Sequence, residues 1–101
     1  MIAKNIINKL NKALENRTRL GIMSLLVVNE DMDFTSMKRH LDISDGNLAT
    51  QIKALVKINY ISTQKKFLNN KPNTSYRITK EGENAFKQQL DALEILIKQS
   101  K

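Results

Sequence analysis

The segment TSMKRHLDISDGNLATQIKALVKINYI, residues Thr35–Ile61, contains two helix starts separated by a short break. Thr35 is a suitable N-cap for a short helix that reaches Leu41. After the break at residues 42–43, Ser44 is a suitable N-cap for a second helix. The spacing therefore predicts two helices joined by a three-residue turn.

The second of these helices has two chemically different faces. Leu48, Ile52 and Leu55 fall within an arc of about 60° on a helical wheel, and Asn59 tolerates the left-handed conformation that often ends a helix. The opposite face carries small and polar residues, namely Gly46, Thr50, Lys53 and Lys57, flanked by Asn47, Ala49 and Ala54. We expect the apolar face to enter the core and the other face to remain accessible.

A β-hairpin is predicted directly after this helix pair. Residues 61–68 are rich in β-prone side chains, and residues 74–78 (TSYRI) can form the returning strand. Residues 69–73 (NNKPN) are turn formers, which predicts a hairpin tip of five residues or slightly more.

Apolar residues at helical spacing flank this core on both sides. In the first 15 residues, Ala3, Ile7, Leu10 and Leu14 predict a helix of about 13 residues. A further helix is expected over Arg17–Val28, ending at Asn29. Its expected inner face is Leu20, Met23, Leu26 and Val27.

A long C-terminal helix is expected from about residue 80, with Thr79 as its N-cap. Its apolar stripe consists of Phe86, Leu90, Leu93 and Ile97, at spacings of four, three and four. Residues 1–101 therefore form one domain, mainly α with a small β-hairpin (α+β). It has an N-terminal helix (1–15), a core (16–80) and a C-terminal helix (80–101).

The whole net charge of +7 lies in the central part of the chain. Residues 34–80 contain nine Lys or Arg and two Asp, whereas the two flanks together contain eight basic and eight acidic residues. Clustered positive charge indicates a polyanionic partner, either nucleic acid or an anionic membrane. Membrane binding through the Lys-rich first helix is disfavoured because that flank is electrically balanced.

Several classes of protein are excluded or disfavoured by composition. The chain has no Cys and one His, His40, so disulfides and thiol nucleophiles are excluded and no metal site is expected. Its three glycines are far apart, so no phosphate-cradling loop is expected. We therefore expect no enzyme activity and no cofactor. No signal peptide or membrane span is evident, and a cytoplasmic location is expected.

Two helices joined by a three-residue turn and followed by a Lys-rich hairpin describe a winged helix-turn-helix. In three segments the sequence resembles winged-helix bacterial regulators related to the MarR, PadR and ArsR families. These are NRTRLGIMSLL (Asn16–Leu26), the segment Thr35–Ile61, and YRITKEGENAF (Tyr76–Phe86). The resemblance implies binding to double-stranded DNA and a role in transcription regulation.

The second helix of the pair is the expected recognition helix, because an α-helix fits the major groove of B-DNA. Asn47, Thr50 and Gln51 are the candidates for contacts with base edges, and Lys53 is the candidate for a phosphate contact. Ser44 at its N-terminus can also bind phosphate. The preceding helix offers similar candidates in Thr35, Ser36 and Lys38.

Two residues of the recognition helix depart from this pattern. Gly46 is unfavourable in a helix, which indicates either close approach of the backbone to DNA or a poorly formed first turn. Asp45 favours the helix dipole but repels phosphate, unless it accepts a hydrogen bond from a cytosine amino group.

The hairpin, or wing, supplies further basic candidates. Lys65, Lys66 and Lys71 can follow the DNA backbone or enter the minor groove. Arg77 either joins them or forms a surface salt bridge.

The terminal helices carry more apolar surface than a domain of this size easily covers. The resemblance favours a homodimer built from these helices, which would present two recognition helices to major grooves about 34 Å apart on a palindromic operator. The candidate interface residues are Ile7, Leu10, Leu14, Phe86, Leu90, Leu93, Leu96 and Ile97. Any small-molecule effector, whose identity the sequence does not indicate, is expected at this interface or beside the terminal helices. The alternative is a winged helix that binds a protein through these helices without specific DNA binding.

Overall fold

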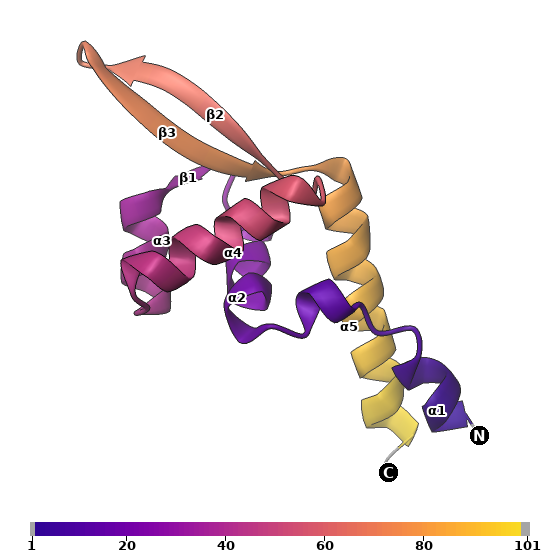
Figure 1. Cartoon of the computed structure of the whole chain (residues 1–101). Helices are drawn as coiled ribbons and strands as arrows, with labels where there is room; N and C mark the ends of the chain where they lie inside the picture. The colour runs from indigo at the N-terminus through magenta and orange to yellow at the C-terminus, as the bar shows by residue number, and fades with distance from the viewer. Residues whose placement is uncertain (1, 100–101) are drawn as a thin grey trace.

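The computed structural model describes residues 2–99, with side chains for residues 5–98. Figure 1 shows a helical body from which a β-hairpin projects at one end and two helices at the other, giving extents of 57 × 26 × 21 Å. The three strands form one antiparallel sheet in the order β1-β3-β2. The elements are α1 (Ile2–Ile7), the 3-10 helix η1 (Lys12–Leu14), α2 (Arg17–Val28), β1 (Met32–Asp33), α3 (Phe34–Leu41), α4 (Asp45–Lys57), β2 (Ile61–Leu68), β3 (Lys71–Ile78) and α5 (Lys80–Gln99). The predicted winged helix-turn-helix with added terminal helices is confirmed.

The helix pair forms nearly as predicted. Ser44 caps α4, and its hydroxyl accepts a hydrogen bond from the backbone N–H of Asn47 at 3.1 Å. Asn59 adopts the left-handed conformation just after α4, with φ of 63°. The predicted cap of α3 was wrong, because Asp33 rather than Thr35 accepts a hydrogen bond, at 2.8 Å, from the N–H of Ser36. An aspartate at the N-cap also favours the positive end of the helix dipole.

The core lies where α2 crosses beneath α4. Leu48, Ile52 and Leu55 of α4 are buried as predicted, and Met37 of α3 joins them. The bounds of α2 are also as predicted, but Val27 is 45% exposed and Ile22 is fully buried instead. The buried stripe is displaced because α2 packs against α3, α4, β3 and α5 at once.

The hairpin turn is tighter than predicted. Only Asn69 and Asn70 lie between the strands, and their φ angles of 54° and 64° are both positive, as a type I′ turn requires. The returning strand therefore begins at Lys71, and Phe67 lies opposite Pro72. The twist of a type I′ turn matches that of the strands, so the pairing continues to the tip.

The N-terminal region does not form the expected continuous helix. α1 ends at Ile7, and Asn11 instead caps η1 by accepting a hydrogen bond from the N–H of Ala13. The backbone N–H of Asn11 also donates to Oε1 of Gln89 at 2.8 Å, and its Nδ2 donates to the hydroxyl of Tyr60 at 2.7 Å. These tertiary hydrogen bonds keep the segment between α1 and η1 from continuing as an α-helix. The side chain of Ala3, also assigned to this helix, lies outside the described residues.

The C-terminal helix α5 begins as predicted and then presents a different face to the body. The hydroxyl of Thr79 accepts a hydrogen bond from the N–H of Gly82 at 2.9 Å. Gly82 is buried, and a Cβ there would collide with the backbone carbonyl oxygen of Tyr60. Beyond it, the buried residues of α5 are Ala85, Phe86, Gln89 and Ala92, whereas Leu90 and Ile97 of the predicted stripe are exposed.

Candidate nucleic-acid interface

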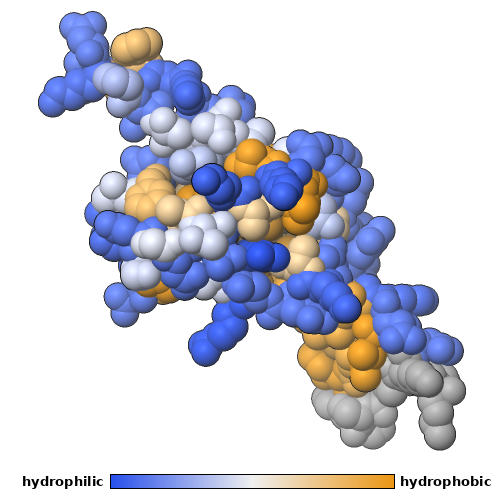
Figure 2. All heavy atoms as spheres, viewed as in Figure 1, coloured by the Kyte–Doolittle hydropathy of each residue, from blue (hydrophilic) through white to orange (hydrophobic). Residues whose placement is uncertain are grey.

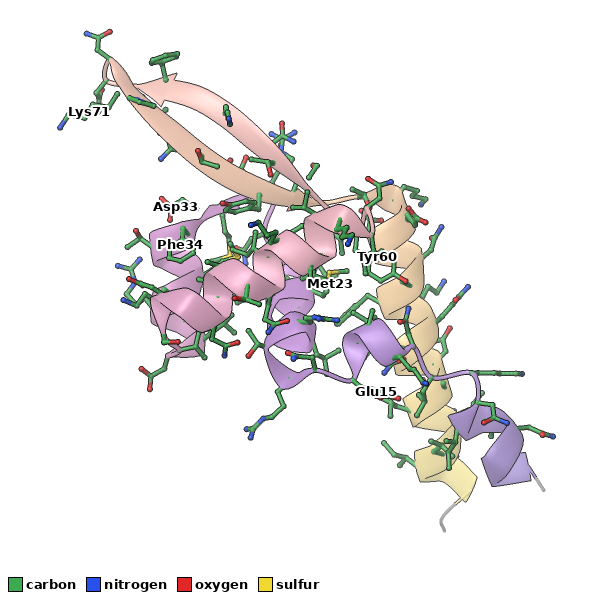
Figure 3. All side chains as sticks on the ribbon, viewed as in Figure 1. Glu15, Met23, Asp33, Phe34, Tyr60 and Lys71 are labelled. Carbon is green, nitrogen blue, oxygen red and sulfur yellow. The ribbon has the colours of Figure 1, made fainter. Side chains whose placement is uncertain are left out.

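The recognition-helix candidate α4 is held by its apolar face and leaves the opposite face accessible. Figure 3 shows it crossing the front of the body, with Met23 of α2 close behind it. The exposed residues along it include Gly46, Asn47, Ala49, Thr50, Lys53 and Lys57. Within residues 2–99, neither Lys53 nor Lys57 forms an ion pair.

The first turn of α4 is well formed, which excludes one of the two interpretations of Gly46. Ser44 caps the turn, and a Cβ added to Gly46 would have no heavy atom within 4 Å. Packing therefore does not require glycine here. A poorly formed first turn is therefore excluded, and close approach of the backbone to DNA stays a prediction.

Asp45 and Lys38 neutralise each other at the start of α4. Their carboxylate and ammonium groups lie 2.7 Å apart, and both side chains are exposed. The ion pair reduces the repulsion that Asp45 would exert on a phosphate, and it also occupies a predicted phosphate ligand. Close by on α3, Thr35 is exposed, while Ser36 is half-buried.

Two of the predicted base-contact residues belong to a hydrogen-bond chain that reaches α2. Nε of Arg19 donates to Oε1 of Gln51 at 2.7 Å, and Nε2 of Gln51 donates to Oδ1 of Asn47 at 3.3 Å. Nδ2 of Asn47 then donates to the hydroxyl of Thr18 at 3.1 Å. Sequence reasoning missed Thr18 and Arg19. The available signal was a polar helix start, Arg17 to Arg19, in a segment that a helix-turn-helix packs against the recognition helix.

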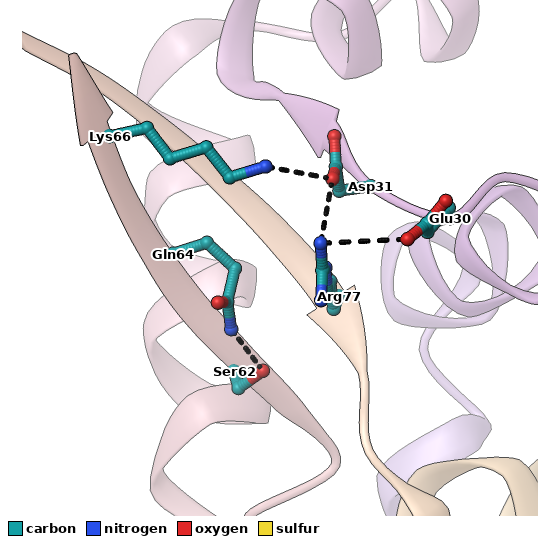
Figure 4. A network of polar contacts seen from close by, with 6 residues as sticks. All are labelled: Glu30, Asp31, Ser62, Gln64, Lys66 and Arg77. Carbon is teal, nitrogen blue, oxygen red and sulfur yellow. Dashed lines mark hydrogen bonds and ion pairs between the residues drawn. The ribbon is translucent and has the colours of Figure 1, made fainter.

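The basic residues of the wing divide into two groups. Lys71 lies beside the hairpin tip, far from the helical body (Figure 3), and Lys65 is exposed on the neighbouring strand. By contrast, Lys66 and Arg77 bind the carboxylate of Asp31 at 3.4 and 3.3 Å, and Arg77 also lies 3.6 Å from Glu30 (Figure 4). The structure thus pairs Arg77 in a salt bridge, one of its two predicted roles.

The acidic loop before β1 is shaped by these contacts. The hydrogen bond from Arg77, assisted by Lys66, lowers the pKa of Asp31 below its ordinary value. The pKa of Asp33 is lowered mainly by the backbone hydrogen bond from Ser36. Because the loop joins α2 to β1, these ion pairs tie the base of the wing to the body. The sequence signal for these ion pairs was the cluster of acidic side chains at residues 30–33, in a chain that is basic as a whole.

α4 and β2 of the wing pack against each other, which brings these two basic elements together. Between Gly46 and Lys80 there are seven Lys or Arg and no Asp or Glu. A shallow groove separates α4 from the hairpin, and it is lined by Phe34, Ala49, Ile52, Lys53, Val56, Thr63 and Tyr76. The hairpin tip also exposes Phe67 and Leu68.

The residues predicted to form a dimer interface fall into two groups, those buried in the core and those exposed at the surface. Leu14 and Phe86 are buried in the core of their own subunit, so we remove them from the proposed contact set. Ile7, Leu90 and Ile97 are 55%, 47% and 61% exposed, and Leu10, Leu93 and Leu96 are half-buried. Ile95, missed as an interface residue, is 45% exposed. Figure 2 shows an apolar patch over the end formed by α1 and α5.

Residues 2–99 contain neither a membrane-spanning helix nor a cluster of metal-binding side chains. No helix there combines the length and apolar character needed to cross a bilayer. No group of three or more His, Asp or Glu side chains in that range is arranged to hold a metal ion.

Comparisons with known proteins agree with this architecture. A transcriptional regulator homologue from Pyrococcus horikoshii OT3 has a similar structure, with a TM-score of 0.86, 29% identity, and coverage of 100% of this chain and 99% of that one. PadR of Bacillus subtilis, solved in complex with operator DNA, has a similar fold, with a TM-score of 0.67 and 13% identity over 74% of this chain and 47% of that chain. An uncharacterised protein of Methanocaldococcus jannaschii is 32% identical over 76 residues, which are 75% of this chain and 83% of the relative.

The family comparison covers most of the structure described above. Residues 18–97 match the model of the winged helix DNA-binding domain, from the start of α2 to the end of α5. The matched range includes α4, the wing and the hydrogen-bond chain of Arg19. This chain belongs to the family of winged helix DNA-binding domains.

Proposed function

We propose that this protein is a transcriptional regulator that binds double-stranded DNA sequence-specifically, without a catalytic step. The observation that carries the proposal is that α4 packs against the wing, and that these two elements together carry six basic residues and one acidic residue, Asp45. The family membership and the operator complex of PadR support it.

In this proposal α4 enters the major groove, and its first half faces base edges. Thr50 is exposed on the outward face, and the amides of Asn47 and Gln51 lie beside it. Amides of this kind can bond adenine through paired donor and acceptor atoms. Lys53 lies one turn further along and binds phosphate, as does the helix N-terminus at Ser44.

The wing supplies contacts with the DNA backbone. Lys65 and Lys71 are exposed and have no ion pair within the described residues, so their charges are available to phosphates. Lys66 and Arg77 are already bonded to Asp31 and contribute less. We therefore assign the first two to phosphate binding and the second two mainly to holding the wing.

The protein acts as a homodimer on a palindromic operator in this proposal. The support is that the aliphatic side chains of Ile7 on α1 and of Leu90 and Ile95 on α5 are each about half exposed. Exposed apolar clusters often mark association surfaces. A two-fold axis through the end formed by α1 and α5 would place two α4 helices at major grooves about 34 Å apart.

Fluorescence anisotropy with labelled duplexes at several salt concentrations tests the proposal. Affinity should fall steeply with salt, because several phosphate contacts release counterions, and a duplex chosen from a random library should bind at least tenfold more tightly than its scrambled version. No binding at low salt would refute the proposal.

The second candidate is a winged helix that binds another protein through the exposed α1 and α5 surface. The same exposed aliphatic residues favour it. It predicts a monomer in isolation and equal affinity for all duplexes, so sedimentation and the anisotropy series together separate the two candidates.

A further inference from the structure

The hydrogen-bond chain between α2 and α4 has a fixed direction. A guanidinium can only donate hydrogen bonds, so Arg19 obliges Gln51 to turn its oxygen toward α2. The amide nitrogen of Gln51 then faces the oxygen of Asn47, and the nitrogen of Asn47 faces the hydroxyl of Thr18. One donor-only group at the start therefore sets the orientation of both amides.

The orientation of an amide determines which pattern of donors and acceptors it offers to a base. If either amide turned by 180°, its donor and acceptor would exchange places, and the edge that it fits would change. After the internal bonds are made, each amide keeps one N–H and one oxygen lone pair, which is what a two-point contact with adenine requires. The hydrogen-bond chain thus fixes the orientation of both amides and still leaves each of them able to bond a base.

The position of Arg19 suits a role in orienting the two amides better than a role as the partner of an acidic side chain. It lies in the first turn of α2 and is half-buried, and its Nε donates to a neutral amide. Within residues 2–99 it forms no ion pair. Arg17, two residues earlier, is exposed and provides a natural comparison.

We propose that Arg19 is a positioning residue for sequence recognition: it fixes the direction of the Gln51 and Asn47 amides from behind the recognition helix. The inference rests on the proposed DNA-binding function. Base preference would then depend partly on Arg19 of α2, a residue outside the recognition helix.

The variant Arg19→Lys tests this, because it keeps the positive charge but has a methylene group at the position of Nε, the atom that donates to Gln51. Base preferences are measured by selection from a random duplex library, and affinity and salt dependence by anisotropy. We expect the preference at the positions read by α4 to fall about tenfold, which is within the discrimination of one two-point contact. The salt dependence should be unchanged.

Arg17→Lys is the matched control and should leave the base preference unchanged. Thr18→Val removes the hydroxyl at the other end of the chain without changing charge, and we expect a smaller loss of preference. Urea unfolding of each variant establishes that it is folded. If Arg19→Lys keeps the wild-type base preference, or weakens binding to all sequences equally, the inference is wrong.

A measurement on the free protein examines the hydrogen-bond chain without DNA. By NMR, the Nε–H of Arg19 should exchange with solvent more slowly than that of Arg17, and Gln51→Ala should remove this protection. Equal exchange rates in the wild type would contradict the inference. Failure of the wild-type protein to bind any duplex, by contrast, would refute the proposed function itself.

Discussion

The two ends of this molecule have opposite surface chemistry. At one end, α4 and the wing carry six basic residues, and Asp45 at the start of α4 is their one acidic residue. At the other, α1 and α5 expose aliphatic side chains, and the terminal segments 1–15 and 81–101 are nearly neutral, with six basic and five acidic residues. Two basic surfaces repel each other, so the proposed self-association would use the nearly neutral end and leave the basic end available to a polyanion. Each prediction below tests this division.

The largest effect is expected on association. In the double variant Ile7→Gln with Leu90→Gln, a dimer would lose four buried aliphatic side chains. Because each is about half exposed in the single chain, its burial in a dimer is worth about half of the roughly 1.5 kcal/mol for full burial, so dimerisation should weaken by about 100-fold, roughly 3 kcal/mol. Analytical ultracentrifugation measures the mass.

Phe67→Gln is the control, because Phe67 is 78% exposed but lies at the tip of the wing. It should leave the mass unchanged. If Phe67→Gln dissociated the protein and the double variant did not, the assignment of the two ends would have to be reversed.

The next effect compares the same substitution near the start of two helices, α5, where the glycine is tightly packed, and α4, where it is open. Gly82→Ala in α5 places a Cβ against the backbone carbonyl of Tyr60, which cannot easily move, and should lower the free energy of unfolding by about 3 kcal/mol. Gly46→Ala in α4 meets no atom and should raise it by up to roughly 1 kcal/mol, because alanine favours a helix.

Urea unfolding measures both changes. Anisotropy on Gly46→Ala adds a second test, since weaker DNA binding by this more stable variant would indicate close approach of the backbone. A destabilised Gly46→Ala would contradict the open environment of this residue.

The third effect concerns charge. Lys65→Ala with Lys71→Ala removes two unpaired wing charges and should weaken binding to all duplexes by about tenfold, with the salt slope reduced by about 2. The control at the neutral end, Lys9→Ala with Lys87→Ala, should leave both quantities unchanged. Equal effects of the two double variants would show that total charge, rather than its location, determines binding.

The smallest effect is on the free energy of unfolding at acidic pH, and it concerns Asp31 and Asp33 at the base of the wing. The pKa values of Asp31 and Asp33 are lower folded than unfolded, so their stabilisation is complete above their ordinary unfolded pKa and is lost as the pH falls through the folded values. Asp33→Asn keeps a capping side chain that does not titrate. Its free energy of unfolding should therefore fall less than that of the wild type between pH 5 and pH 2, by under about 1 kcal/mol. An unchanged pH profile would contradict this.

Local signals predicted the elements of the fold, and tertiary contacts account for the differences. The cap at Ser44, the left-handed residue at Asn59 and the bounds of α2 depend on neighbouring residues, and all were predicted. The N-terminal helix failed because Asn11 bonds Tyr60 and Gln89, which are 49 and 78 residues away. The turn at Asn69-Asn70 was predictable in principle, since two asparagines accept the positive φ of a type I′ turn.

The candidate site shows the same contrast. The polar face of α4 and the basic wing follow from spacing and composition. The residues that form hydrogen bonds with these side chains are distant in the sequence. Arg19 is 32 residues from Gln51, and Asp31 is 46 residues from Arg77. No periodicity connects such pairs, so the sequence did not distinguish the bonded cations of the wing from the unbonded ones.

The geometry of the wing also bears on solubility. β2 lies at the edge of the sheet, and β1 covers only two residues of β3, so the outer hairpin presents open strand edges beside the exposed Phe67 and Leu68. Such edges can pair with strands of other molecules and start aggregation. Lysines on β2, and Pro72 without an N–H on β3, oppose that pairing. The lysines proposed to bind phosphate therefore also keep the DNA-free protein dispersed, and replacing them with apolar residues would favour aggregation through the wing.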